Sequence, residues 1–262
     1  MKFNKRIKIS LSLLLVLSLL VAVSCSKKED KNVDLEAGLA YLTAQEEKDP
    51  AEVDNAIQAI KQQRMDAQRE ELLQQLISGE RDVWGMFSDA AVLGDSRAVG
   101  FSYYDYLSGD RVLATSGERI TSIVDHYEEL HALNPSYIFL CYGLNDIVFW
   151  DGAEEYAQGY GEILTDLQNE FPNATIIVSS ILSVFDPAFE KESDWYQLPD
   201  YSAAVAEYCQ ENGIPFANND ELCAEHSDLW QPDGIHLLPD FYHYWASNLI
   251  LTMLESSDAV AE

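Results

Sequence analysis

The 262-residue sequence is poor in cysteine. It contains four cysteines, none of them paired in a Cys-x-x-Cys motif, so the sequence indicates neither a disulfide-stapled small fold nor a zinc site. Cys25 belongs to an N-terminal segment described below, and Cys141 lies inside a predicted strand as a small buried hydrophobic residue. The sequence leaves open whether Cys209 and Cys223 form a disulfide.

Basic residues are also scarce. The chain has 16 lysines and arginines against 45 aspartates and glutamates, which gives a formal net charge of -29 at pH 7. A field of this sign repels phosphate backbones, so we expect no nucleic-acid partner. Polyanionic substrates are disfavoured for the same reason, whereas neutral glycans, uncharged esters and cationic ligands remain. The sequence has no HExxH motif, P-loop, dinucleotide-binding fingerprint or calcium loop, so we predict no cofactor and no metal.

Long apolar runs are limited to the N-terminus. A basic head precedes the apolar run from Ile9 to Val23, which at about fifteen residues is shorter than the roughly twenty that a membrane-spanning helix needs. This pattern predicts an export signal over residues 1–25. Ala22-Val23-Ser24-Cys25 resembles the lipobox of bacterial lipoproteins, although Ala22 replaces the usual leucine. The resemblance implies lipidation of Cys25 and an anchor at the outer face of a bacterial cell membrane, with simple secretion as the alternative.

The hydrophobic pattern divides the remaining chain into three parts. Residues 26–87 form a charged tether with two helical patterns, around 35–42 and over 49–77, residues 88–256 form a globular domain, and residues 257–262 form a C-terminal tail. Strands are predicted at 90–94, 111–117, 136–142, 174–184 and 214–217, and helices at 120–133, 154–170, 201–212 and 241–254. Five strands separated by helices predict an α/β fold, a mostly parallel sheet with helices on both faces.

The first predicted strand ends in Gly94-Asp95-Ser96. In open α/β sheets, ligands bind outside the carboxyl ends of the strands, so Ser96 is a candidate nucleophile. The polar stretch that follows can begin a helix whose free N–H groups favour a developing negative charge. Taken alone, the tripeptide is equally well explained as an ordinary turn.

Asp233 and His236 lie in a loop before the last predicted helix. A serine becomes a useful nucleophile when an imidazole takes its proton and a carboxylate orients that imidazole. A spacing of three residues lets one turn bring both side chains to the same side. The alternative is an aspartate that caps the closing helix beside an incidental histidine.

Two further residues, Gly117 and Asn145, end predicted strands and should therefore lie on the same rim as Ser96. A glycine N–H can approach a substrate without side-chain obstruction, and an asparagine amide supplies a second donor to a developing oxyanion. Ordinary strand-end turns are the alternative for each residue.

Taken in order, these blocks resemble those of the SGNH/GDSL hydrolase family. The matching blocks are Gly94-Asp95-Ser96, the glycine after the second strand, Gly143-Leu144-Asn145-Asp146 and Asp233-Gly234-Ile235-His236, over about residues 88–256. The resemblance implies a three-layer, flavodoxin-like fold. It also implies that Ser96 is the nucleophile, that Asp233 and His236 complete a triad, and that the Ser96 amide, the Gly117 amide and the Asn145 side chain form an oxyanion hole. Arg97 replaces the family's leucine, and we expect its charge near the pocket mouth.

The sequence therefore predicts an exported serine esterase that removes short acyl groups, O-acetyl groups above all, from carbohydrate through an acyl-enzyme. The alternatives are an O-acyltransferase with the same triad, a lysophospholipase-like lipid esterase, and a non-catalytic glycan-binding envelope protein. Aromatic residues in the predicted rim loops either stack on sugar rings or pack the loops onto the domain. They are Trp150, Trp195, Tyr196 and Trp230. The sequence does not specify the natural acyl group, the alcohol or the oligomeric state.

Overall fold

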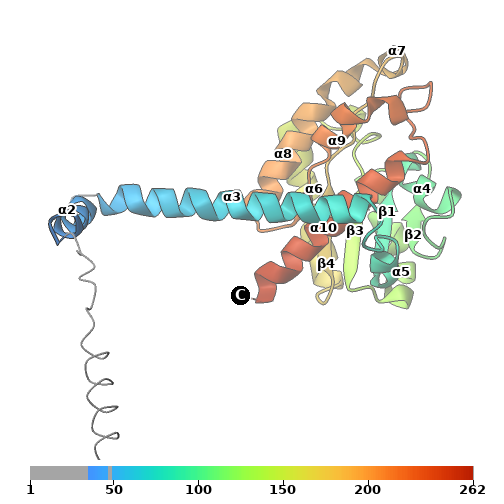
Figure 1. The fold of residues 1–262 in the computed structure, drawn as a ribbon. Helices are drawn as coiled ribbons and strands as arrows, with labels where there is room; N and C mark the ends of the chain where they lie inside the picture. Colours follow the sequence, from blue (N-terminus) through green and yellow to red (C-terminus); the bar gives the residue numbers. More distant parts are fainter. Residues whose placement is uncertain (1–34, 47–48, 262) are drawn as a thin grey trace, which may run out of the picture. The chain divides into compact units, whose positions relative to one another are not determined.

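The computed structural model describes residues 35–46 and 49–261 (Figure 1). The predicted signal over residues 1–25, with Cys25, lies outside the described residues. Among the described helices, none combines the length and the apolar character needed to span a bilayer. The chain divides into two compact units, Met1–Arg64 and Met65–Glu262.

The first unit is helical where the structure describes it. It contains α2 (Leu35–Glu46) and the first part of α3 (Pro50–Ile77), which confirms both helical patterns of the sequence. Proline is tolerated at the first position of a helix because the N–H it lacks has no partner there. Asp49 precedes it, and its carboxylate accepts a hydrogen bond from the Ala51 N–H at 2.9 Å, which explains why α3 begins at Pro50.

The second unit is built on a five-stranded sheet in which every pair of neighbouring strands is parallel. The strand order is β2-β1-β3-β4-β5, the flavodoxin-like order, so the predicted α/β class is confirmed. The strands are β1 (Ala90–Gly94), β2 (Val112–Ala114), β3 (Tyr137–Cys141), β4 (Thr175–Ser179) and β5 (Phe216–Ala217).

Helices cover both faces of this sheet (Figure 1). Alternate side chains of a strand point to opposite faces, and in β1 Leu93 packs in one apolar core while Val92 packs in the other. The Leu93 core includes α6 and α8, and the Val92 core includes α4 and α10. The helices are α4 (Ser96–Tyr103), α5 (Tyr127–Leu133), α6 (Ala153–Glu170), α7 (Ala188–Lys191), α8 (Leu198–Glu211), α9 (Asp220–Glu225) and α10 (Phe241–Ala261), with short 3-10 turns η1 (Gly85–Asp89), η2 (Ile120–His126), η3 (Ile147–Phe149), η4 (Ser193–Gln197) and η5 (Ser227–Leu229).

One predicted strand is too long. The sequence predicts strand over 174–184, but β4 ends at Ser179 because its neighbour β5 is only two residues long. The Ser180 N–H still donates to the Ala217 carbonyl, whereas the Ile181 N–H donates to the Ser202 hydroxyl, a side chain of α8. Residues 180–187 therefore leave the sheet as a loop that is free to run along its rim.

Other boundaries also differ from the sequence prediction. The predicted helix over 120–133 begins as the 3-10 turn η2 before it becomes α5, and the predicted strands at 111–117 and 214–217 shorten to β2 and β5. The predicted tail at 257–262 is helical as far as Ala261, because α10 continues. The second compact unit spans Met65–Glu262, and Leu76, Val83 and Phe87, which precede the predicted hydrolase domain, belong to the core on the α10 side.

Candidate active site

The site begins at the turn between β1 and α4. A Cβ atom at Gly94 would lie 2.5 Å from the Cys141 carbonyl oxygen and 2.6 Å from the Ala98 Cβ, so only glycine lets α4 start this close to β3. Asp95 is the N-cap of α4, and its Oδ1 accepts a hydrogen bond from the Arg97 N–H at 2.9 Å. Ser96 is the first residue of the helix and is half-buried at the rim of the sheet.

The loop before α10 brings Asp233 and His236 to this serine. His236 Nε2 lies 3.1 Å from Ser96 Oγ, and His236 Nδ1 lies 2.6 Å from Asp233 Oδ2. The other carboxylate oxygen of Asp233 accepts the backbone N–H groups of Ile235 and His236 at 2.9 and 3.0 Å. One turn thus holds acid and imidazole together, and Ser96, His236 and Asp233 form a continuous chain of contacts.

The Asp233 carboxylate is only half-buried, with 43% of its side chain exposed. Burial by itself would raise its pKa, but the hydrogen bonds from the His236 ring, the His236 N–H and the Ile235 N–H outweigh burial and leave the pKa below its usual value. Asp233 therefore remains ionised at neutral pH and accepts a hydrogen bond from the N–H at His236 Nδ1. This arrangement directs the lone pair of His236 Nε2 toward Ser96.

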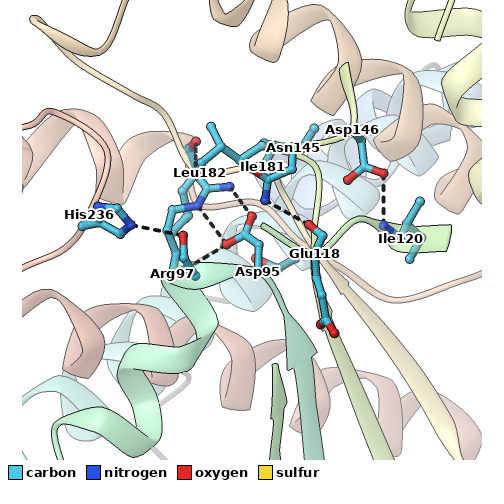
Figure 2. Close-up of polar contacts among 12 residues, drawn as sticks. Asp95, Arg97, Glu118, Ile120, Asn145, Asp146, Ile181, Leu182 and His236 are labelled. Atoms are coloured by element: carbon cyan, nitrogen blue, oxygen red, sulfur yellow. Dashed lines mark hydrogen bonds and ion pairs between the residues drawn. The ribbon is translucent and has the colours of Figure 1, made fainter. Parts of the chain in front are cut away.

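Asn145 and Gly117 lie on neighbouring loops. Asn145 follows β3, and its Nδ2 donates to the Glu118 carbonyl at 2.9 Å (Figure 2). Gly117 follows β2 in an exposed turn, with φ of 86°. The end of β2 adjoins the turn that carries Ser96, because the Thr115 N–H donates to the Gly94 carbonyl at 3.3 Å. The loops after β1, β2 and β3 thus meet at one rim of the sheet.

The prediction that the charge of Arg97 lies near the mouth of a pocket is wrong. Its side chain is 3% exposed rather than at the mouth of a pocket, because it folds back onto the buried carboxylate of Asp95. Its Nη1 also donates to the Leu182 carbonyl at 2.8 Å (Figure 2). Sequence reasoning missed this pair, although a charged residue replacing leucine beside a buried strand signals a need for an opposite charge nearby.

Asp146 is a second buried carboxyl that the sequence analysis did not single out. Its Oδ1 accepts the Ile120 N–H at 3.0 Å, which joins the loops after β2 and β3 (Figure 2). Among the described residues, its Oδ2 has no hydrogen-bond partner, and neither have the buried hydroxyls of Tyr142, Tyr156 and Tyr160. Burial raises the pKa of Asp146 to about 7.

Replacing Asp146 by asparagine is expected to stabilise the fold above pH 7. The pKa of this carboxyl is near 7 in the folded state, against an ordinary value of 3.8. Its contribution to the free energy of unfolding is therefore fully present below pH 3.8 and is lost as the pH rises through 7. The loss is on the order of 2–4 kcal/mol. Asparagine keeps the acceptor for the Ile120 N–H but does not ionise.

Urea unfolding at pH 5 and pH 8 tests this expectation. The stability difference between wild type and Asp146→Asn should favour the variant more at pH 8, while Asp125→Asn, an exposed aspartate of η2, should show no such trend. A difference that is the same at both pH values would contradict the expectation.

The aromatic residues of the rim loops have different roles. Trp195 and Trp230 are buried, and their indole N–H groups donate to the carbonyls of Leu144 and Ser183 at 3.0 and 3.2 Å. They therefore pack the loops onto the domain and are not free for stacking on a sugar. Tyr196 is 67% exposed and stacks on Phe189 with ring centroids 4.0 Å apart.

The described cysteines are free thiols. Cys141, Cys209 and Cys223 are all buried, so Cys209 and Cys223 do not form a disulfide. Burial raises the pKa of the Cys209 thiol to about 12 and that of the Cys223 thiol to about 11. Within the described residues, no group of three or more histidine, cysteine, aspartate or glutamate side chains is placed to hold a metal ion.

Comparison with known proteins gives a family match. Residues 84–244 match the model of the GDSL-like Lipase/Acylhydrolase family. A putative GDSL-like lipase from Parabacteroides merdae is similar in structure, with a TM-score of 0.52 and 18% identity over 63% of this chain and 95% of that chain. A family 3 carbohydrate esterase from Clostridium thermocellum also has a TM-score of 0.52 and 18% identity, over 66% of this chain and 98% of that chain. No curated protein matches the sequence significantly.

Proposed function

The chain belongs to the GDSL-like lipase/acylhydrolase family and is a carboxylic ester hydrolase, and from this premise we propose that it removes short acyl groups from carbohydrate. The observation that carries the proposal is the chain of contacts from Asp233 through His236 to Ser96. The net charge of -29 supports a neutral substrate over a polyanionic one. The choice of a carbohydrate ester is supported by the C. thermocellum esterase and by this charge argument, and the choice of an O-acetyl group is supported by the resemblance of the sequence blocks to the family.

In the proposed mechanism, Ser96 Oγ attacks the ester carbonyl while His236 Nε2 takes the hydroxyl proton. Asp233 stabilises the imidazolium through its contact with Nδ1. The tetrahedral intermediate collapses as His236 returns the proton to the departing alcohol, which leaves the acyl group on Ser96. Water then attacks the acyl-enzyme with His236 as the base, and the acid is released with Ser96 restored.

The developing oxyanion needs donors near Ser96. We assign these to the Ser96 N–H at the start of α4, the Gly117 N–H and the Asn145 side chain. One N–H of the Asn145 amide already donates to the Glu118 carbonyl, and this contact leaves the second N–H for the substrate. The amide is therefore held in place before substrate binds.

Replacing Asn145 by alanine is expected to lower kcat about 100-fold to 1000-fold, because one preorganised donor is lost in the transition state. KM should change little, since the donor acts mainly on the developing charge. Asn212→Ala, which removes a side chain at the end of α8, is the matched control and should retain wild-type kcat. An Asn145→Ala kcat within threefold of wild type would remove Asn145 from the oxyanion hole.

Hydrolysis of para-nitrophenyl esters from acetate to octanoate, followed by acetylated oligosaccharides, tests the substrate class. We expect acetate to be the best of the series and acetate release from the oligosaccharides. A preference for octanoate would favour a lipid esterase, and transfer of acetyl to an added sugar in preference to water would favour an acyltransferase. A chain that binds glycans but hydrolyses no ester would favour the envelope scaffold.

We also propose that the protein is exported and anchored by a lipid on Cys25. The basic head, the apolar run and the lipobox-like residues before Cys25 support this location. Cell fractionation should place the protein with the membrane and the Cys25→Ser variant outside the membrane fraction. An unmodified Cys25 in the N-terminal peptide of the membrane-bound protein, measured by mass spectrometry, would contradict the anchor.

A further inference from the structure

The turn that carries Ser96 contains a buried ion pair. The Asp95 carboxylate is 0% exposed, and the Arg97 guanidinium pairs with both of its oxygens, Nη2 to Oδ2 at 3.3 Å and Nε to Oδ1 at 3.4 Å. Figure 2 shows the two side chains facing each other beside Leu182, which belongs to the loop of residues 180–187. The pair thus flanks the candidate nucleophile on both sides in the sequence.

A buried carboxylate at this position is a problem for ester hydrolysis. The oxyanion forms beside the Ser96 N–H, and an unpaired negative charge one residue away opposes it strongly in a desolvated site. Asp95 also lies close enough to act on the oxyanion loops, because after burial its charge is a further cause of the raised pKa of Asp146, the neighbour of Asn145. A cation that cancels this charge is therefore of direct use to the reaction.

Arg97 also joins loops that carry different parts of the site. Its Nη1 donates to the Leu182 carbonyl at 2.8 Å, and three residues further on the Phe185 N–H donates to the Gly234 carbonyl at 2.9 Å, within the Asp233–His236 turn. From α10, the Tyr242 hydroxyl donates to the Arg97 carbonyl at 2.7 Å. The side chain is thus held by Asp95 and the Leu182 carbonyl, and Tyr242 holds the backbone of the same residue.

We propose that Arg97 is a positioning residue for the hydrolysis, which acts by neutralising the buried Asp95 carboxylate beside the nucleophile. The inference rests on the proposed function. A residue that acts through its charge can be distinguished from one that only packs. If charge is the cause, removing the cation alone should lower kcat, and removing the carboxylate charge as well should restore part of that kcat.

The experiment compares Arg97→Leu, the double variant Asp95→Asn with Arg97→Leu, and Arg97→Lys. Asparagine can still cap α4, and both leucine variants lose the bond to the Leu182 carbonyl, so the first two differ mainly in the carboxylate charge. We expect Arg97→Leu to lower kcat on para-nitrophenyl acetate about 100-fold with KM within about threefold of wild type. The kcat of the double variant should be at least about tenfold higher than that of Arg97→Leu, and the kcat of Arg97→Lys should stay within about tenfold of wild type.

A double variant no faster than Arg97→Leu, or an Arg97→Leu variant with wild-type kcat, would overturn the inference. If Arg97→Leu does not fold, a double variant that folds and is active supports the charge role, and an inactive folded one overturns it. The rate at which a fluorophosphonate probe labels Ser96 separates this inference from the proposed function. If the wild type neither hydrolyses esters nor is labelled by the probe, both the proposed function and the inference about Arg97 are refuted. If the wild type is labelled and the Arg97→Leu variant is labelled at the same rate, only the inference about Arg97 is refuted.

Discussion

Ester hydrolysis by the Ser96→Ala variant is expected to fall by about four orders of magnitude or more, with the residual rate supplied by the oxyanion donors and substrate binding. The reason is that no other described side chain stands 3.1 Å from His236 Nε2 as Ser96 Oγ does. Without the hydroxyl no acyl-enzyme forms, and the oxyanion donors can assist only direct attack by water. The measurement is kcat on para-nitrophenyl acetate, with intact-protein mass spectrometry for the acyl-enzyme after a rapid quench.

The matched control is Ser102→Ala on the same helix. The Ser102 hydroxyl donates to the Val99 carbonyl of its own helix, so this variant should keep wild-type kcat. Substantial turnover by Ser96→Ala, with an acyl adduct still detected on the protein, would place the nucleophile elsewhere.

The second large effect is expected for Asp233→Asn, with a fall in kcat of about 1000-fold at neutral pH. Asparagine keeps acceptors for the Ile235 and His236 N–H groups, but its amide can leave His236 in the tautomer that carries its proton on Nε2. The imidazole then cannot take the proton of Ser96. We place the effect below the largest known for triad aspartates because the Asp233 side chain is 43% exposed.

The pH dependence of this loss follows from the low pKa of Asp233. Since the carboxylate remains ionised from weakly acid to alkaline pH, the ratio of wild-type to variant kcat should stay large across pH 6–9. Asp240→Asn, an exposed aspartate after the same loop, should behave as wild type. A variant that loses less than tenfold would show that His236 is oriented by something other than Asp233.

Local patterns in the sequence were sufficient to predict the parts of the site that depend on local geometry. The turn at Gly94-Asp95-Ser96 and the three-residue spacing of Asp233 and His236 are set by residues within one turn of each other. The parallel sheet follows from alternating strands and helices, whereas the flavodoxin-like arrangement is implied by the family resemblance. These features need no knowledge of what packs against them.

Features that depend on distant partners were not predicted. The direction of the Arg97 side chain depends on Asp95 and on the Leu182 carbonyl, which is 85 residues away. The end of β4 depends on the short length of β5, and the burial of Trp195 and Trp230 depends on carbonyl acceptors in other loops. The hydrophobic periodicity or the sequence motif of one segment contains no information about contacts with distant segments.

The buried thiols make the native protein a reporter of its own N-terminal processing. Cys141, Cys209 and Cys223 are shielded from solvent, and their raised pKa values keep them as unreactive thiols at neutral pH. Alkylation by iodoacetamide without denaturant should therefore leave these three unmodified. Cys25 is the remaining cysteine of the sequence. A folded chain that gains one carbamidomethyl group therefore has an unmodified Cys25, whereas a folded chain that gains no such group has a Cys25 that is lipidated or cleaved away.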